Sequence, residues 1–302
     1  MALAVVAGVV SCKEHYITYD DAEYLIFSDT LSTNAVVISG EPFKVPVSST
    51  VARDYDRTYA VEIIDKGSNA IEGLHYRLKS NTFTIPAGKL STDIEVYGNY
   101  ENIEPTDSLG FTLQLVMPEK LKWNLYPEYN RTKVVMFKAC PFDINEWGGT
   151  EKEPRYCLLT SALLYSFPGT NTSYSRLAEC YKHKNKPNTV VLKSLFYDGY
   201  NVELTFNTEN PSEPTLTMVA DQIIGDELSV LGIEWGDGKL LAQTIPSGSY
   251  VSSYNACQKY AQLYVRMYIK NFSELVGYVG DFYNILEWVS KEEAEEIMRE
   301  GL

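Results

Sequence analysis

A ten-residue stretch near the C-terminus, residues 260–269, alternates strictly between two kinds of side chain. The odd positions are apolar and the even positions are polar or aromatic: Ala261, Leu263, Val265, Met267 and Ile269 against Tyr260, Gln262, Tyr264, Arg266 and Tyr268. Strict alternation predicts a half-buried β-strand, because successive side chains on a strand point to opposite faces. We therefore expect the odd residues to enter a core and the even residues to form the other face.

Short runs of a similar kind fill much of the chain. Between residues 24 and 138, about seven β-branched or alternating runs are separated by turn residues; 43–47, 58–64 and 111–116 are examples. Short strands at regular intervals are typical of a β-sandwich, in which one face of each strand packs and the other is solvated. The first half of the chain is therefore predicted to be a β-sandwich.

The second half indicates further antiparallel hairpins. Residues 190–196 and 200–206 flank Asp198-Gly199. This dipeptide favours a type I′ turn, which needs positive φ at both central positions. Residues 232–241 indicate a similar hairpin, and the mostly polar residues 166–188 predict a long surface loop.

Two features delimit this second unit. Pro141 blocks further ladder pairing because proline has no N–H group, which predicts a domain boundary there. Ser290 and Glu293 have the spacing of a capping box, which predicts a short C-terminal helix. The predicted fold class is all-β: a β-sandwich over residues 34–139, followed by a second antiparallel β-sandwich or barrel-like domain over 140–302 that ends in the helix.

Four blocks in the first half have an order and spacing that resemble the Calx-beta-like module: residues 54–57, 70–76, 85–88 and 109–113. They include its Glu-Gly-x-x-Tyr and Ile-Pro-Ala-Gly sequences, and the resemblance covers about residues 34–118. It implies an immunoglobulin-like sandwich of the kind found in Bacteroidota surface lipoproteins of unknown function. In that class, a second β domain often opens with the pattern seen here at Asp143, Trp147, Gly149 and Thr150.

Some Calx-beta modules bind calcium through clustered carboxylates, so the resemblance raises the question of a metal site. Here His75 stands where those modules usually carry Asp. Calcium needs six to eight oxygen ligands, and Asp54, Asp56 and Glu72 are a thin supply. We therefore predict no metal site and no cofactor.

The N-terminus indicates a lipid anchor. Residues 2–10 form an apolar run that is too short to span a bilayer, which takes about 20 residues, but suits the core of a signal peptide. Val9-Val10-Ser11-Cys12 resembles the lipobox of bacterial lipoproteins, which implies lipidation of Cys12. No Lys or Arg precedes the run, so the n-region of the predicted signal peptide (residues 1–12) is missing. The alternative is a buried N-terminal strand or short helix that happens to contain a cysteine.

The charged residues after Cys12 indicate where such a lipoprotein would lie. Lys13-Glu14 resembles the surface-export signal of Bacteroidota lipoproteins. The expected location is the outer membrane, with the protein facing the extracellular side and residues 13–33 forming a polar tether and a first strand. A net charge of −14 excludes nucleic acid as a partner, because nothing offsets the phosphate repulsion.

Export would permit disulfides. Cys140, Cys157, Cys180 and Cys257 allow three pairings, and the sequence does not choose among them or against four free thiols.

The even-numbered face of residues 260–269 is the candidate ligand site. Tyr260, Tyr264 and Tyr268, with Gln262 and Arg266 between them, could stack on sugar rings and hydrogen-bond to their hydroxyls. The alternative is a strand packed under a loop or facing a barrel lumen.

Catalytic motifs are mostly missing. The sequence has no Gly-x-Ser-x-Gly, no phosphate-binding loop and no His-Glu-x-x-His. We therefore expect no enzyme and no catalytic residues, and favour a non-catalytic surface lipoprotein that binds extracellular glycan as an accessory to polysaccharide capture. One alternative is a structural or adhesive scaffold that assembles with other outer-membrane proteins. A less favoured one is a glycoside hydrolase with a carboxylate pair.

Overall fold

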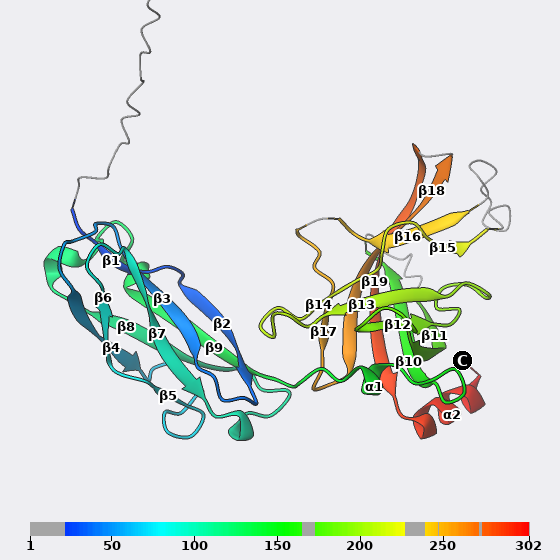
Figure 1. Ribbon diagram of the computed structural model, residues 1–302, viewed down its shortest axis with the longest axis horizontal. Helices are drawn as coiled ribbons and strands as arrows, with labels where there is room; N and C mark the ends of the chain where they lie inside the picture. The colour runs from blue at the N-terminus through cyan, green and yellow to red at the C-terminus, as the bar shows by residue number, and fades with distance from the viewer. Residues whose placement is uncertain (1–21, 165–172, 227–238, 247, 272–273, 302) are drawn as a thin grey trace, which may run out of the picture.

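The computed structural model describes residues 22–164, 173–226, 239–246, 248–271 and 274–301 (Figure 1). Two β-rich units follow one another along the chain, and short helices account for the rest of the regular structure. The all-β prediction is confirmed. Cys12 lies outside the described residues.

The first unit is a sandwich of two sheets. One sheet has the order β1-β3-β7-β5, and the other has the order β2-β9-β8-β4-β6 with β2 parallel to β9. Their bounds are β1 Leu25–Phe27, β2 Leu31–Val37, β3 Phe43–Ser49, β4 Arg57–Ile64, β5 Tyr76–Leu78, β6 Thr82–Ile85, β7 Ser91–Gly98, β8 Leu109–Val116 and β9 Arg131–Ala139. Three 3₁₀ turns accompany them: η1 Tyr100–Asn102, η2 Glu119–Leu121 and η3 Pro127–Asn130. Alternate residues of these strands fill the core between the sheets, as the sequence pattern predicts.

An ion pair secures the start of this unit. Arg57 is 4% exposed and donates to Glu23 Oε1 at 2.8 Å, to Ser49 Oγ and to the Lys89 carbonyl. Burial alone would raise the pKa of Glu23, but hydrogen bonds from Arg57 and Arg53 outweigh it and hold that pKa below its usual value. Glu23 therefore binds the segment before β1 to the sandwich.

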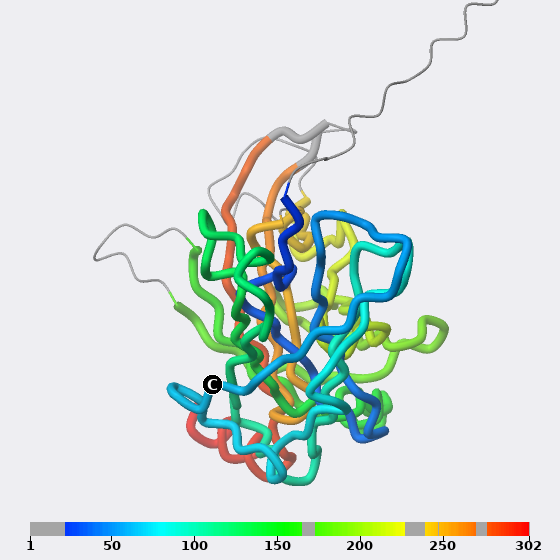
Figure 2. Tube along the Cα trace, turned by 90° about the vertical axis from the view of Figure 1, so that its left-hand side faces the viewer, coloured from blue at the N-terminus to red at the C-terminus, as the bar shows by residue number. Residues whose placement is uncertain are grey.

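The second unit is a closed barrel with two added strands. The ring runs β10-β11-β12-β13-β14-β17-β18-β19 and closes because β19 pairs with both β10 and β18. Strands β16 and β15 branch from the far half of β18. The bounds are β10 Arg155–Leu163, β11 Ser173–Lys182, β12 Thr189–Leu192, β13 Val202–Asn207, β14 Thr215–Thr217, β15 Gln222–Gly225, β16 Leu240–Thr244, β17 Ser253–Asn255, β18 Tyr260–Asn271 and β19 Glu274–Val289. Figure 2 shows β18 (orange) and β19 (red) rising side by side beyond the ring.

The alternation in residues 260–269 has the predicted consequence. All five odd residues of β18 are buried in the barrel core, which confirms their predicted inward orientation. Trp147, at the end of α1 (Ile144–Trp147), is almost fully buried and packs against Phe206, Tyr254 and Trp288. Trp147 therefore helps to fill the barrel interior.

Strands β12 and β13 pair as the predicted antiparallel hairpin. Two details in this part of the second unit were predicted wrongly: the turn of this hairpin, and the loop over 166–188. Strand β12 ends at Leu192, and the turn that follows is longer than two residues, because Leu195 and Phe196 leave the ladder to be buried in the core. Gly199 has positive φ but Asp198 does not, so no type I′ turn forms. The predicted loop over 166–188 contains strand β11, whose inward side chains Ala178 and Cys180 are too small to give a strong apolar signal.

The predicted hairpin over 232–241 lies mostly outside the described residues. Its final residues begin β16, which pairs with β15 and β18.

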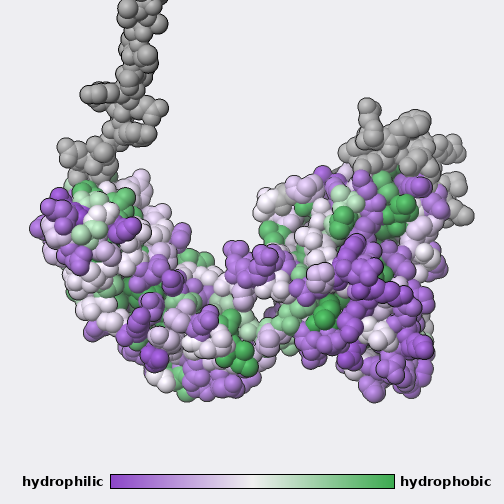
Figure 3. Space-filling model, in the orientation of Figure 1, coloured by the Kyte–Doolittle hydropathy of each residue, from purple (hydrophilic) through white to green (hydrophobic). Residues whose placement is uncertain are grey.

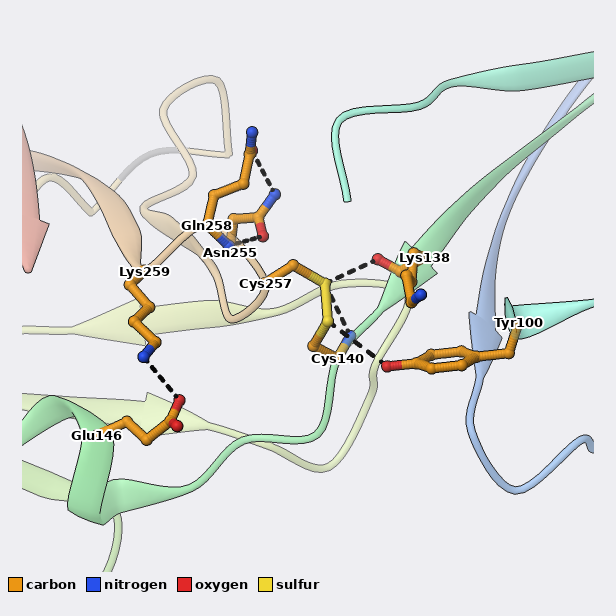
Figure 4. Close-up of a disulfide and its surroundings, with 8 residues drawn as sticks. All are labelled: Tyr100, Lys138, Cys140, Glu146, Asn255, Cys257, Gln258 and Lys259. Atoms are coloured by element: carbon orange, nitrogen blue, oxygen red, sulfur yellow. Dashed lines mark hydrogen bonds and ion pairs between the residues drawn. A yellow bond between two sulfur atoms is a disulfide. The ribbon is translucent and has the colours of Figure 1, made fainter. Parts of the chain in front are cut away.

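A disulfide joins the connection between the units to the barrel. Cys140 follows β9 and is bonded to Cys257, 117 positions later (Figure 4). The Tyr100 hydroxyl of the sandwich lies 3.5 Å from Cys140 Sγ. Cys157 and Cys180 are free and buried in the barrel. The structure thus has one disulfide and two free thiols, which is neither a complete pairing of the four cysteines nor four free thiols.

The chain ends in α2 (Lys291–Glu300). The capping box is present: Ser290 Oγ accepts from the Glu293 N–H, and the Glu293 carboxylate accepts from the Ser290 N–H. Ala294 is buried where α2 contacts β10 and β11. The predicted C-terminal helix is confirmed. Within the described residues, no helix combines the length and apolar character needed to cross a membrane.

Candidate functional site

The five predicted site residues lie on the outward side of β18, but they differ in exposure. Tyr260, Gln262, Tyr264 and Arg266 are partly exposed. Tyr268 is only 3% exposed. The face is therefore accessible in part and covered at one end.

Tyr268 is held by the chain segment that precedes β15. Its hydroxyl donates to Asp221 Oδ1 at 2.5 Å and accepts from the Asp221 N–H at 3.1 Å. Burial, together with the hydrogen bond to Asp221, raises the pKa of Tyr268 to about 12. Tyr268 thus belongs to the packing between β18 and the segment before β15, and does not offer its ring to a ligand.

Neighbouring segments bring two further tyrosines to Tyr264. Tyr283 is the direct partner of Tyr264 on β19, and their ring centroids are 5.1 Å apart. Strand β18 pairs with β17 near its start and with β16 farther along, so the connection between those strands loops past Tyr264. This loop carries Tyr250, whose ring centroid is 5.4 Å from that of Tyr264. Burial raises the pKa of Tyr283, with a smaller contribution from Tyr264.

A charged pair adjoins these rings. Arg266 Nε and Nη2 donate to the two carboxylate oxygens of Asp281 at 2.8 and 2.9 Å. The Arg266 guanidinium also lies 5.5 Å from the ring centroid of Tyr278. Tyr278 is 59% exposed. The hydrogen bond to Asp281 raises the pKa of Arg266. Such a bidentate pair fixes the guanidinium while leaving part of it accessible.

We call this group of residues the tyrosine face: Tyr250, Tyr264, Tyr278, Tyr283, Arg266 and Asp281. Chemically it combines apolar ring surfaces with phenol hydroxyls and an oriented charged pair. Tyr260 and Gln262 continue the same side of β18 toward β17. Four members of the tyrosine face were not predicted from the sequence, because their proximity depends on how the chain pairs and folds: Tyr250, Tyr278, Tyr283 and Asp281. The sequence signal that could have pointed to this face is the presence of two more tyrosines, at positions 278 and 283, shortly after residues 260–269.

A second feature, which is concave, lies between the two units. It is a cleft of about 490 Å³ whose walls include Ile38 from the sandwich and Pro211 and Tyr254 from the barrel, beside the Cys140–Cys257 disulfide. This cleft was not predicted, since its lining comes from segments far apart in the sequence.

The described residues contain no group of three or more His, Cys, Asp or Glu side chains placed to hold a metal ion. Asp54 and Glu72 are exposed, and Asp56 Oδ1 accepts a hydrogen bond from the Ala87 N–H.

Several solved structures are similar to this chain at low identity. One is a protein of unknown function from Bacteroides ovatus, at 10% identity over 87% of this chain and 89% of that chain, with a TM-score of 0.33. Another is the apo form of the Calx CBD1 domain, at 14% identity over 39% of this chain and 98% of that one, with a TM-score of 0.32. A third is an auxiliary nutrient binding protein from Bacteroides thetaiotaomicron, at 14% identity over 90% of this chain and 94% of that chain, with a TM-score of 0.29.

No curated protein matches the chain. A family model does match residues 128–300, which include the last strand of the sandwich and the barrel. The chain belongs to the family described as Domain of unknown function (DUF4984).

Proposed function

We propose that this protein is a non-catalytic cell-surface lipoprotein whose tyrosine face binds extracellular glycan, as an accessory to polysaccharide capture. The observation that carries the proposal is the row of Tyr250, Tyr264 and Tyr283, with neighbouring centroids 5.1–5.4 Å apart. Aromatic faces bind the apolar faces of sugar rings, and phenol and guanidinium groups at their edges hydrogen-bond to sugar hydroxyls. Few other ligand classes need both kinds of contact.

The charged pair favours binding over catalysis. Glycoside hydrolysis needs one carboxylic acid that can donate a proton and a second carboxylate nearby. Asp281 is 6% exposed, and both of its oxygens accept from Arg266, so it is poorly placed to donate a proton. The Arg266–Asp281 pair instead suits a fixed donor for ligand hydroxyls.

The proposal includes an anchor and a division of the chain. We propose residues 1–12 as a signal peptide that ends in the lipidated Cys12, and 13–33 as the tether and first strand. A Calx-beta-like module then covers 34–139, and the ligand-binding domain covers 140–302. Lipidation would hold the protein on the outer membrane facing outward, where outer-membrane uptake proteins are the expected partners.

A scaffold role is a second candidate because of one feature of the sandwich. Strand β6 ends the five-stranded sheet, so among the described residues one of its edges has no neighbouring strand. Open edges can pair with a strand of another protein. Cross-linking on intact cells tests this role: a reproducible cross-link at β6 supports it, and a protein that remains uncross-linked at β6 contradicts it.

The direct test of glycan binding is a panel of immobilised polysaccharides, probed with the full chain and with Tyr264→Ala. Tyr55→Ala is the matched control, since Tyr55 is an exposed tyrosine of the sandwich. The proposal predicts that at least one immobilised polysaccharide binds the full chain and the control protein but does not bind Tyr264→Ala. A panel without binding, or equal binding by all three proteins, would overturn it.

A further inference from the structure

Four aromatic rings gather at the end of the sandwich where the described chain begins. The Tyr24 ring stacks on Trp123 at 5.6 Å, and Tyr126 and Tyr129 approach Trp123 at 4.5 and 6.3 Å. These four residues and Leu125 are called the aromatic tip. In Figure 3, apolar surface (green) gathers where the described chain starts. The rings cover one another, so Trp123 is largely enclosed by its neighbours.

The outermost part of the aromatic tip is apolar. The Tyr126 N–H donates to the Trp123 carbonyl at 3.0 Å, which closes a turn that carries Leu125. Leu125 is 80% exposed, more than any other large apolar residue among those described, and Tyr126 is 46% exposed. Leucine makes no side-chain hydrogen bonds, so this turn suits an apolar partner better than a sugar.

The position of the aromatic tip points to a particular partner. Tyr24 is twelve residues after Cys12, and a chain of that length spans roughly 40 Å when fully extended. Leu25, next to Tyr24 of the tip, pairs with Ser49 at one end of β3. The other end of β3 pairs with the part of β7 that also pairs with β5, so Tyr76 marks the opposite end of the sandwich. A lipid on Cys12 would therefore hold the aromatic tip within roughly 40 Å of the membrane, and the tip is nearer to the tether than the opposite end of the sandwich is.

The charges near the aromatic tip are almost balanced. Lys120, Lys122 and Arg131 are offset by Glu119 and Glu128. Attraction to anionic lipid therefore contributes little, and insertion of apolar and aromatic side chains would dominate. Tryptophan and tyrosine favour the membrane–water interface, where the ring is buried and its polar atom stays hydrated.

We propose that the aromatic tip is a contact site for a lipid surface, with Leu125 and Tyr126 inserted at the interface. The contact orients the sandwich on the membrane that holds its anchor. This inference rests on the proposed lipidation of Cys12. The lipid anchor supplies the affinity for the membrane, and the aromatic tip fixes the tilt of the sandwich relative to the membrane plane.

The test uses the full acylated chain in vesicles of phosphatidylethanolamine and phosphatidylglycerol. A fluorophore is attached at Leu125→Cys, and in a control protein at Ile71→Cys, an exposed residue in the loop before β5. Cys157 and Cys180 are buried and should not react. Lipids with a quencher on the acyl chain then report contact with the bilayer interior.

Each outcome decides one point. The proposal predicts loss of emission at residue 125 but not at residue 71, with little change on adding salt. If the protein floats with the vesicles but its emission is the same at residues 125 and 71, the proposed contact of the tip with lipid is wrong, while the proposed lipid anchor stands. Failure to float overturns the anchor and the tip contact together. If soluble polysaccharide, and not lipid, changes the fluorophore emission at residue 125, the tip is a glycan-binding site instead.

Discussion

At the scale of single residues, alternation predicts which way a side chain points but not what covers it. The inward residues of β18 were predictable because a strand's two-residue period is local. The outward Tyr268 was not, because Asp221, 47 positions earlier, folds over it. The same limit applies to Tyr283, which reaches Tyr264 only through the register of β18 and β19.

Tyr268 and Tyr264 should therefore respond differently to substitution. Tyr268→Phe removes the hydroxyl that bonds to Asp221 and should lower the free energy of unfolding by about 1 kcal/mol, without weakening glycan binding. Chemical denaturation and a binding titration of the same variant check both parts. Weakened binding by a folded Tyr268→Phe protein would return Tyr268 to the ligand site.

The Glu23–Arg57 pair predicts a pH effect. Glu23→Gln leaves Arg57 buried without its charged partner and should cost roughly 1–3 kcal/mol at neutral pH. Because the pKa of Glu23 is lowered in the folded state, the pair's contribution is complete above the usual carboxyl pKa. It is lost as the pH falls through the lowered value. Unfolding at pH 7 and pH 3 should show a large difference between the two proteins at pH 7 and a smaller one at pH 3.

Glu101→Gln is the control for that experiment, since Glu101 is exposed. It should match the unsubstituted protein at both pH values. A Glu23→Gln protein as stable as the control at neutral pH would contradict the structural role of the pair.

At the scale of elements, a local sequence signal predicted the structure only where packing in the core did not override it. The capping box at Ser290 correctly predicted α2 because all of its contacts lie within one turn. The type I′ turn predicted at Asp198-Gly199 does not form, because Leu195 and Phe196 leave the strand to be buried in the core and the connection is longer. Strand β11 was missed because a barrel interior accepts small residues such as Ala178, which carry little apolar signal.

The cap of α2 gives a prediction at this scale. Ser290→Ala removes the acceptor for the Glu293 N–H and should destabilise the helix and its contact with β10 by about 1 kcal/mol. Ser290→Asp keeps an acceptor at the same position and should restore stability. Thermal unfolding compares the three proteins. If Ser290→Asp is as unstable as Ser290→Ala, the cap does not explain the loss.

At the scale of the whole molecule, the sequence predicted two successive β units but not how they are connected. The pairing of Cys140 with Cys257 closes a loop of 117 positions, and no local pattern selects it over the other pairings. The two cysteines of that bond also line the cleft between the units. The tyrosine face depends on the pairing of β18 with β19, since β19 brings Tyr283 and Asp281 to β18.

The disulfide should contribute much of the barrel's resistance to unfolding. Replacing both Cys140 and Cys257 by Ser removes the constraint on the unfolded chain, with an expected loss of up to about 5 kcal/mol for a loop of this length. Thermal unfolding measures the loss, and peptide mapping without reductant identifies the bond. Replacing the buried Cys180 by Ala is the comparison, and it should leave the mapped bond in place. A Cys140–Cys157 or Cys180–Cys257 peptide would contradict the pairing.

The central claim is that the tyrosine face holds a glycan. Calorimetric titration of the double variant Tyr264→Ala/Tyr283→Ala with a polysaccharide that the full chain retains tests it most directly, with Tyr55→Ala as the control. Loss of two stacking rings should weaken the affinity by about tenfold or more, since 1.4 kcal/mol corresponds to a factor of ten. An unchanged affinity in the folded double variant would contradict the claim.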